Sequence, residues 1–428
     1  MWYAMLDAQR RLIRAMALGA LPGRGDNGCD ALAECMKGGD ALPALRGWLC
    51  RSTCSLDHAP SFSIDSVCAS GRVVPVRETI ADEVPAGALR KFARAGAAAR
   101  RSGNWPVVLC APLAGHHAVM LREMLETLLA HREVYVTDWT DARDIPAEAG
   151  ALTLDDYVLA TERFIRSVSS PGTRVHVVAV CQATVPALAA AALLAGEPAS
   201  PLASLALLGG PIDAGLNPTA VERFAMSHSL SWFREHVIDT VPPPYRGRGR
   251  RVYPGYLQQA AIVAAYPGRL IGLETRYWSA WLAGNTREAQ AALRALHEYA
   301  AVLDMTEQYF LDTIRVVFHE RRLACGKWTI ATRPVEARAL ARVALCTVEG
   351  DRDEITGAGQ THCAHALCGA DDAPPRHRLT VAQCDHYDLF TGPRWRETVH
   401  PRLCAFWHET ERVWRAARDK RSVTGTPA

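Results

Sequence analysis

The sequence lacks a surplus of charge of either sign. It has 48 Lys and Arg residues against 45 Asp and Glu residues in a chain of 428, a formal net charge of +3. A protein that binds nucleic acid through its phosphates needs a much larger basic excess, because each contact neutralises one phosphate charge. We therefore expect no nucleic-acid partner.

Signals for export and for membrane insertion are also missing. The first residues, MWYAMLDAQRRLIRAM, contain no continuous apolar core followed by a small-residue cleavage site. Residues 175–196 contain no Asp, Glu, Lys or Arg and are numerous enough to cross a bilayer, but His176, Gln182 and Pro186 interrupt them. Their β-branched first half and Ala-rich second half indicate a strand and a helix joined by a turn. We expect a cytoplasmic protein with no membrane span.

Paired metal-ligand spacing is absent too. The 13 cysteines include no C-x-x-C pair, which is the spacing typical of a zinc knuckle. Cys and His residues gather in two places, Cys29, Cys35, Cys50, Cys54 and His58 in one, and His362, Cys363, His365 and Cys368 in the other. The second group lies on a predicted helix, where its members point around the axis. We predict no metal and no cofactor, and we expect the cysteines to be free thiols.

What the sequence does contain is an alternation of short apolar runs with amphipathic helical patterns. This is typical of a mostly parallel sheet covered by helices on both faces. The expected strands cover residues 72–77, 106–110, 134–138, 174–180, 204–209, 341–348 and 378–383. The helical patterns between them cover residues 116–131, 154–168 and 182–196.

The alternation stops for roughly 130 residues after the strand at 204–209, far more than a connection needs. This stretch has a helical pattern and is rich in Trp and Tyr, which favours an insertion that covers a substrate groove. We predict an α/β-hydrolase fold. Its core is formed by residues 71–214 and 336–412, with a helical cap at 215–335, an N-terminal helical or irregular appendage at 1–70 and a flexible tail at 413–428.

The most informative motif is A-V-C-Q-A at residues 179–183, where the β-branched run ends and the Ala-rich helix begins. It has the form of a nucleophile elbow, G-x-S-x-G, with Cys181 in place of Ser and alanines in place of the glycines. Small residues are needed there because the strand-to-helix turn is cramped. The turn also places the thiol at a helix N-terminus, whose partial positive charge favours the thiolate.

Residues of the right type follow in the order in which an α/β-hydrolase supplies its acid and its base. Asp353 follows the strand at 341–348, and His386 follows the strand at 378–383. The carboxyl ends of parallel strands meet at one edge of a sheet, so the three side chains are expected to come together. A lone loop Asp or His is usually a solvated or structural residue, but three residues in the correct order predict a catalytic triad of Cys181, Asp353 and His386.

Longer motifs resemble those of the intracellular polyhydroxybutyrate depolymerases. The similar segments are APLAGHHAVMLR, VYVTDW, VCQATVP, GGPIDAGLNP, RRVYPGYLQ, VEGDRDEITGAGQT and HYDLFTGPRWRETVHPR. The resemblance runs from about residue 59 to about residue 411 and implies the same triad, Cys181, Asp353 and His386. It also implies hydrolysis of poly(3-hydroxybutyrate) at the granule surface, with water or coenzyme A as acceptor. Where the family often has Gly before its catalytic His, this chain has Cys384 and Asp385, and an acidic neighbour would raise the pKa of His386.

An ester-cleaving cysteine also needs hydrogen-bond donors for the oxyanion. In this fold they are the backbone N–H of the residue after the nucleophile and one from the loop after the first core strand. These are Gln182 and the loop 114–116, with Gly115 and His116 as the expected donors. The side chains of His116 and His117 are candidates for a catalytic role and equally for anchoring that loop.

Two other readings of the sequence stay open. A polyhydroxyalkanoate synthase-like acyltransferase would use a similar triad, although its elbow usually keeps glycines where this chain has Ala179 and Ala183. A non-catalytic granule-associated protein would retain the hydrolase framework and adsorb through the amphipathic pattern of residues 1–18. The sequence does not fix the acceptor, the product length, the polyester side-chain preference, the oligomeric state or the role of residues 21–54.

Overall fold

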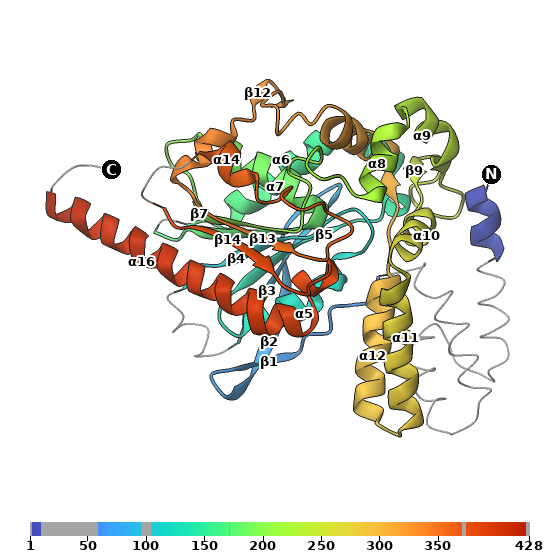
Figure 1. Cartoon of the computed structure of the whole chain (residues 1–428), viewed down its shortest axis with the longest axis horizontal. Coiled ribbons are helices and arrows are strands. Elements are labelled where there is room, and N and C mark those ends of the chain that lie inside the picture. The colour runs from blue at the N-terminus through green and yellow to red at the C-terminus, as the bar shows by residue number, and fades with distance from the viewer. Residues whose placement is uncertain (1, 10–58, 96–103, 171, 370–373, 425–428) are drawn as a thin grey trace.

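The computed structural model describes residues 2–9, 59–95, 104–170, 172–369 and 374–424, with side chains up to residue 418. A nine-stranded sheet runs through it (Figure 1) in the order β1-β2-β3-β5-β4-β6-β7-β13-β14. Its strands are β1 (Ser66–Ala69), β2 (Arg72–Val84), β3 (Gly87–Arg94), β4 (Val107–Cys110), β5 (Val134–Trp139), β6 (Val175–Val180), β7 (Leu202–Leu208), β13 (Ala344–Gly350) and β14 (Arg376–Val381). From β5 to β14 every pairing is parallel, whereas β1, β2, β3 and β5 pair antiparallel.

This sheet is the core of an α/β-hydrolase fold, so the predicted fold class is confirmed. Every strand expected from the sequence is present, although β2 runs seven residues further than expected, and β1 and β3 are additional. The sheet starts at Ser66, inside the segment expected to be an appendage, because β1 pairs with β2 as a hairpin.

Helices cover both faces of the sheet. The core helices are α5 (Arg122–Leu129), α6 (Leu154–Val168), α7 (Thr184–Ala195), α14 (Ala364–Cys368), the short α15 (Gly392–Arg394) and α16 (His400–Thr424). Alternate residues of β6 enter different apolar clusters: Val177 packs with residues of α6 and α7, and Val178 packs with residues of α5 and α16. The strand is therefore apolar on both faces, which explains its continuous β-branched run.

The insertion forms a cap beside the carboxyl edge of the sheet (Figure 1). Its helices are α8 (Ala220–Ser227), α9 (Leu230–His236), α10 (Gly255–Ala265), α11 (Pro267–Leu282), α12 (Thr286–Ala300) and α13 (Glu307–Thr313). The cap is mainly helical, as expected, but it also holds a small sheet of β8 (Asp239–Thr240), β9 (Arg251–Tyr253) and β10 (Met305–Thr306). A hairpin of β11 (Thr329–Ile330) and β12 (Arg333–Pro334) leads back to the core.

Short turns of other helix types complete the fold. The 3-10 turns are Ala118–Leu121, Ala142–Asp144, Ala147–Ala149, Cys181–Ala183, Ala337–Arg342 and Tyr387–Leu389, and the π-helical turns are Ile314–His319 and Trp395–Val399.

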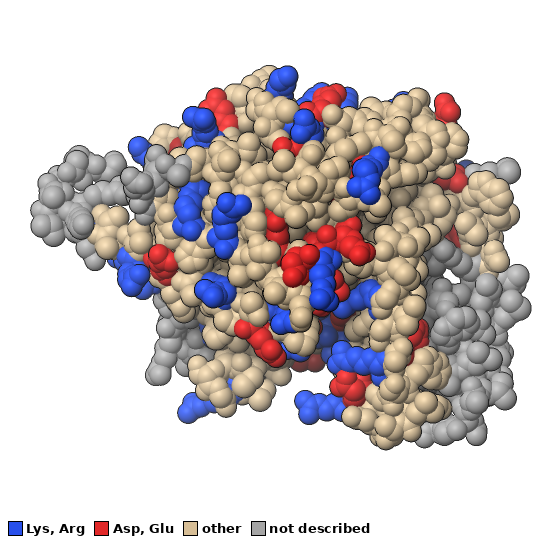
Figure 2. Space-filling view, viewed as in Figure 1, with Lys and Arg blue, Asp and Glu red and all other residues tan. Residues whose placement is uncertain are grey.

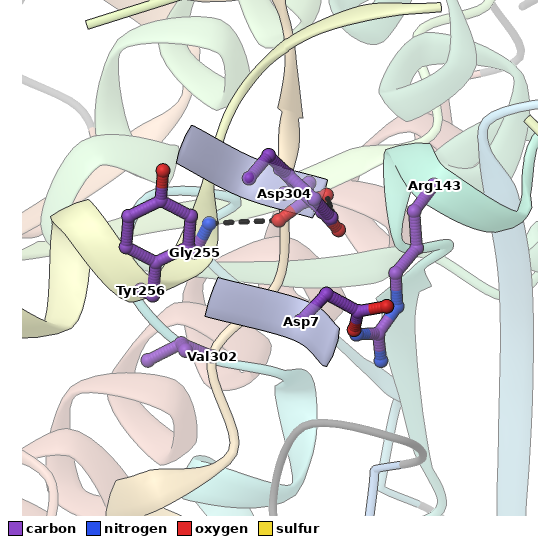
Figure 3. A pocket seen from close by; sticks show the side chains of 7 residues that line it. Asp7, Arg143, Gly255, Tyr256, Val302 and Asp304 are labelled. Atoms are coloured by element: carbon purple, nitrogen blue, oxygen red, sulfur yellow. Dashed lines mark hydrogen bonds between the residues drawn. The ribbon is translucent and has the colours of Figure 1, made fainter. Parts of the chain in front are cut away.

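The helix over residues 2–9 is anchored to the cap by buried polar contacts. Tyr3 is 4% exposed, its hydroxyl donates to Asp304 Oδ2 (2.7 Å) and its backbone N–H donates to Asp239 Oδ2 (2.9 Å). Burial, with the nearby charge of Asp141, raises the pKa of Asp304 well above its usual value. Asp304 Oδ1 also accepts from the N–H of Gly255, at the start of α10 (Figure 3). The cavity among these residues is about 20 Å³, enough for a water molecule, so this cluster is an anchor.

The tail expected to be flexible from residue 413 is instead the second half of α16, which runs to Thr424. No Gly or Pro interrupts residues 402–424, and two contacts hold this part of the helix. Arg415 pairs with Glu411 one turn earlier (3.1 Å), and the guanidinium of Arg174 lies 3.6 Å from the ring centroid of Trp414.

Two further features of the described residues are their surface charge and the apolar character of their helices. On the face shown in Figure 2, basic and acidic side chains are interspersed rather than gathered into a field of one sign. Among the helices of the described residues, none is both long enough and apolar enough to cross a bilayer.

Candidate active site

The elbow at Cys181 adopts the strained turn that its sequence predicts. β6 ends at Val180, a 3-10 turn covers Cys181–Ala183, and α7 follows at Thr184. Cys181 has a φ of 54°, in the left-handed region that non-glycine residues rarely occupy. Its small neighbours Ala179 and Ala183 are 0% and 5% exposed, which is the tight packing that requires small residues there.

A glycine after the neighbouring strand β7 allows that strand to lie close to the turn. A Cβ added to Gly210, just after β7, would lie 1.8 Å from Thr184 Oγ1 and 2.5 Å from the carbonyl oxygen of Cys181. Any side chain at residue 210 would therefore push the elbow out of place. This glycine carries part of the steric role that the motif's own glycines have in other hydrolases.

Asp353 and His386 meet beside the elbow, from the loops after β13 and β14. The distance from His386 Nδ1 to Asp353 Oδ2 is 2.7 Å, and both side chains are 3% exposed. Asp353 Oδ1 accepts two further hydrogen bonds, from the backbone N–H groups of Ile355 and Thr356 (2.9 Å each). The carboxylate is thus fixed on both oxygens, and one of them faces the imidazole.

Cys181 and His386 line the same cavity, and the thiol is close enough to the imidazole to interact with it electrostatically. Burial by itself would lower the pKa of His386. The charge of Asp353, the charge of a thiolate at Cys181 and the hydrogen bond to Asp353 outweigh burial and raise that pKa well above 6.5. Asp385 has another role than the one expected, since its Oδ1 accepts from the N–H of Asp388 (2.9 Å). The three residues predicted from the sequence are together, in the order Asp353, His386, Cys181.

Cys181 and His386 line a cavity of about 270 Å³ between the core and the cap. Most of its remaining lining is apolar, and the cap contributes Ile262, Phe310 and Ile314 to it. Such a cavity takes an apolar acyl group and leaves few polar groups to compete with the reacting carbonyl. The cap therefore forms one wall of the cavity.

The loop 114–117 lies opposite the elbow and has two of its N–H groups bound by glutamine side chains. Ala114 donates to Gln182 Oε1 (3.0 Å), and Gly115 donates to Gln258 Oε1 in α10 (2.9 Å). Gly115 was expected to be an oxyanion donor, but its N–H is engaged by the cap. His116 keeps its N–H without a hydrogen-bond partner among the described residues and lines the cavity.

Burial lowers the pKa of both His116 and His117 to about 4. Both imidazoles are therefore neutral near pH 7. The N–H of His117 donates to the carbonyl oxygen of Ala301 (2.9 Å), so this residue ties the loop to the segment after α12.

Comparison with known families gives one match, over residues 209–411, to the family described as PHB de-polymerase C-terminus. This range contains Asp353, His386 and the whole cap. The match covers slightly less than half of the chain. Together with the α/β-hydrolase fold, it supports a hydrolase. No curated protein matches the chain in sequence.

The solved structures that resemble this chain are distant in sequence. One is a 2-hydroxy-6-oxo-6-phenylhexa-2,4-dienoate hydrolase from Rhodococcus sp. strain RHA1, with 13% identity over 78% of this chain and 99% of that chain, at a TM-score of 0.45. Another is the thioesterase domain from the curacin biosynthetic pathway, with 10% identity over 75% and 97%, at 0.42. A third is a thermophilic esterase from Thermogutta terrifontis, with 12% identity over 78% and 99%, at 0.41. These values are too low to carry a statement about activity.

A Ser-His-Glu cluster that resembles a triad is buried elsewhere in the chain, away from the elbow. Ser204 Oγ is 2.7 Å from His176 Nδ1, and Glu411 Oε1 is 3.2 Å from Nε2. None of the three is more than 3% exposed, and His176 and Ser204 lie near the starts of β6 and β7, whereas Cys181 follows the end of β6. Inaccessible to substrate, this cluster instead links α16 to the sheet.

Of the two groups of Cys and His residues noted in the sequence, the structure describes only the second. The first, residues 29–58, lies outside the described residues. In the second, His362 and His365 both bond Thr347 Oγ1, at 2.7 and 3.0 Å. Within the described part of the chain, no three His, Cys, Asp or Glu side chains are arranged to hold a metal ion.

Proposed function

We propose that this protein cleaves the ester bonds of poly(3-hydroxybutyrate) with Cys181 as nucleophile, His386 as base and Asp353 as the group that orients the base. The observation that carries the proposal is the position of Cys181. It occupies a left-handed turn at the end of a core strand, faces the buried His386–Asp353 pair and opens into an apolar cavity. Strained backbone at such a turn is typical of a nucleophile presented to substrate.

In the first step the proton of Cys181 passes to His386 Nε2, either during attack or beforehand as a thiolate–imidazolium pair, and the sulfur attacks the ester carbonyl carbon. Asp353 holds the proton on Nδ1, which leaves Nε2 able to accept, and its charge stabilises the imidazolium. When the tetrahedral intermediate collapses, the C–O bond breaks and the leaving alkoxide takes the proton from Nε2. A 3-hydroxyacyl thioester on Cys181 and a shortened polymer with a free hydroxyl remain.

In the second step water attacks the thioester carbonyl while His386 takes one of its protons. The C–S bond then breaks, the thiol is restored by that proton, and a 3-hydroxy acid is released. Coenzyme A in place of water would give an acyl-CoA by the same route. Negative charge on the carbonyl oxygen in both steps is stabilised by the N–H of Gln182, in the first turn of its helix where N–H groups lack intrahelical partners, together with a donor from loop 114–116.

An insoluble polyester also needs a surface on which to dock, and α8 offers one beside the cavity. Val221 lines the cavity and is 47% exposed, and Phe224, three residues further along α8, is 48% exposed. The ring of Phe224 contacts that of His228, with centroids 4.3 Å apart. Apolar side chains exposed next to a site favour adsorption to an apolar substrate. We propose that the protein works in the cytoplasm at the surface of polymer granules.

The test uses amorphous poly(3-hydroxybutyrate) granules, with and without coenzyme A, and mass spectrometry of the soluble products. We expect 3-hydroxybutyrate or its short oligomers from wild type, an acyl-CoA when coenzyme A is the acceptor, and neither from Cys181→Ala. The peptide that contains Cys181 should carry the mass of one 3-hydroxybutyryl group after rapid acid quenching.

Other outcomes would identify the alternatives. Growth of polymer from 3-hydroxybutyryl-CoA would make the protein a synthase-like acyltransferase. Granule adsorption without any release of products, in wild type as in Cys181→Ala, would make it a non-catalytic granule protein. Undiminished turnover by Cys181→Ala would refute the assignment of the nucleophile.

A further inference from the structure

The cap does more than cover the cavity, because it also holds the loop that faces the nucleophile. Gln258, in α10 of the cap, is 4% exposed. Its Oε1 accepts from the N–H of Gly115 (2.9 Å), and its Nε2 donates to the carbonyl oxygens of Leu303 (2.8 Å) and Tyr253 (3.4 Å). A carboxamide with three buried partners has a single orientation available to it.

The four consecutive N–H groups of residues 114–117 show what this contact achieves. Ala114 is bound by Gln182, Gly115 by Gln258, and His117 by the carbonyl oxygen of Ala301. The N–H of His116 alone has no hydrogen-bond partner among the described residues. Two of the three acceptors belong to the cap, one on each side of His116.

Gly115 needs such support because its backbone is unusual. It has a φ of 96°, and a Cβ there would lie 3.0 Å from Ile262 Cδ1, a second α10 residue that lines the cavity. Glycine has many conformations available at little cost, so the peptide between Gly115 and His116 depends on its neighbours for its direction. Gln258 removes that freedom by binding the N–H on one side of it.

We infer that Gln258 is a positioning residue for the oxyanion hole: by holding Gly115, it directs the N–H of His116 toward the carbonyl oxygen of the substrate. The inference rests on the proposed function, since it concerns the same reaction. It assigns the loop donor to His116, and it makes a residue of the cap necessary for catalysis without contact with the reacting atoms.

The experiment compares two reactions of the Cys181 sulfur, alkylation and ester cleavage. Alkylation of Cys181 by iodoacetamide needs the nucleophile and His386 but no oxyanion hole, whereas cleavage of a soluble 3-hydroxybutyrate dimer needs all of them. Cys68 and Cys325 are exposed, so alkylation is followed on the Cys181 peptide by mass spectrometry. Gln258→Leu removes the contact, and Gln259→Leu, at the next position of α10, is the matched control.

Loss of one oxyanion donor lowers kcat by about 10²–10³ in enzymes of this type, so a misdirected donor in Gln258→Leu should lower kcat for the dimer about 30- to 100-fold. KM and the alkylation rate should stay within about twofold of wild type, as should every value for Gln259→Leu, because neither variant changes the nucleophile or the base. Gln258 lines the cavity, but Leu replaces it with a side chain of similar size.

A conservative variant covers the case in which Gln258→Leu does not fold. Gln258→Glu keeps an acceptor for Gly115, and when protonated it also keeps a donor to Leu303. The ratio of its kcat to that of wild type, measured at the same pH, should rise toward one as the pH falls. Unchanged kcat in both variants, or a loss of alkylation that parallels the loss of kcat, would overturn the inference. Dimer cleavage by wild type that persists in Cys181→Ala would instead overturn the proposed function, and the inference with it.

Discussion

Replacing Asp353 with Asn changes one atom of the site, and the structure dictates how the new side chain must turn. Asp353 Oδ1 accepts from the N–H groups of Ile355 and Thr356, and Oδ2 faces His386 Nδ1 at 2.7 Å. An amide nitrogen cannot accept a hydrogen bond. The amide oxygen must therefore take the place of Oδ1, and the NH₂ group must face His386.

This orientation reverses the tautomer of the imidazole. With a donor in front of it, Nδ1 must present its lone pair, and the single proton of neutral His386 moves to Nε2. Nε2 then cannot accept the proton of the Cys181 thiol. In serine hydrolases the same exchange costs about 10⁴ in kcat, and each factor of ten is worth about 1.4 kcal/mol. We expect a loss of about 10³–10⁴ here, or about 4–5.5 kcal/mol, because cysteine depends somewhat less on its base.

The assay measures kcat for a soluble 3-hydroxybutyrate oligomer, together with the thermal unfolding midpoint. The midpoint of Asp353→Asn should fall only modestly, since both backbone hydrogen bonds are kept and only the charge paired with His386 is lost. Asp351→Asn is the matched control, because Asp351 is exposed in the same loop and accepts from the N–H of Cys384 (3.1 Å). A kcat for Asp353→Asn within tenfold of wild type would refute the tautomer argument.

Three further predictions concern stability and docking. His176→Leu should lose about 1–3 kcal/mol of unfolding free energy for each buried partner left unsatisfied, Glu411 included, with kcat unchanged; a large fall in kcat in a folded variant would contradict its structural role. Because the pKa of His386 is raised in the folded state, its contribution to the free energy of unfolding should be complete below about pH 6.5 and disappear as the pH rises through the raised pKa. Urea titrations should show a smaller fall of the free energy of unfolding over this pH range in Asp353→Asn than in wild type. Phe224→Ala should weaken adsorption to polymer granules about three- to tenfold, from the loss of about 1 kcal/mol of apolar burial, and leave hydrolysis of a soluble oligomer unchanged; equal effects on both substrates would argue against docking on α8.

The sequence predicted the parallel part of the sheet well because those strands are buried on both faces. A short, continuous apolar run such as residues 174–180 is typical of a strand that is buried on both faces. It missed β3 (Gly87–Arg94), a half-buried strand in which Arg90, Lys91 and Arg94 interrupt the apolar residues. It also predicted a flexible tail where α16 continues, because the contact of Trp414 with Arg174, a residue far away in the sequence, cannot be read from a polar segment.

The sequence by itself determined the strand-turn-helix at Cys181 and the chain order of Cys181, Asp353 and His386, because steric limits at a tight turn and the geometry of a parallel sheet act locally or by simple rule. Only the tertiary structure decided which backbone N–H groups of the loop 114–117 remain available to a substrate. That outcome depends on Gln258, more than a hundred residues away in the sequence, and hydrogen bonds between segments so far apart leave no periodic pattern in the chain.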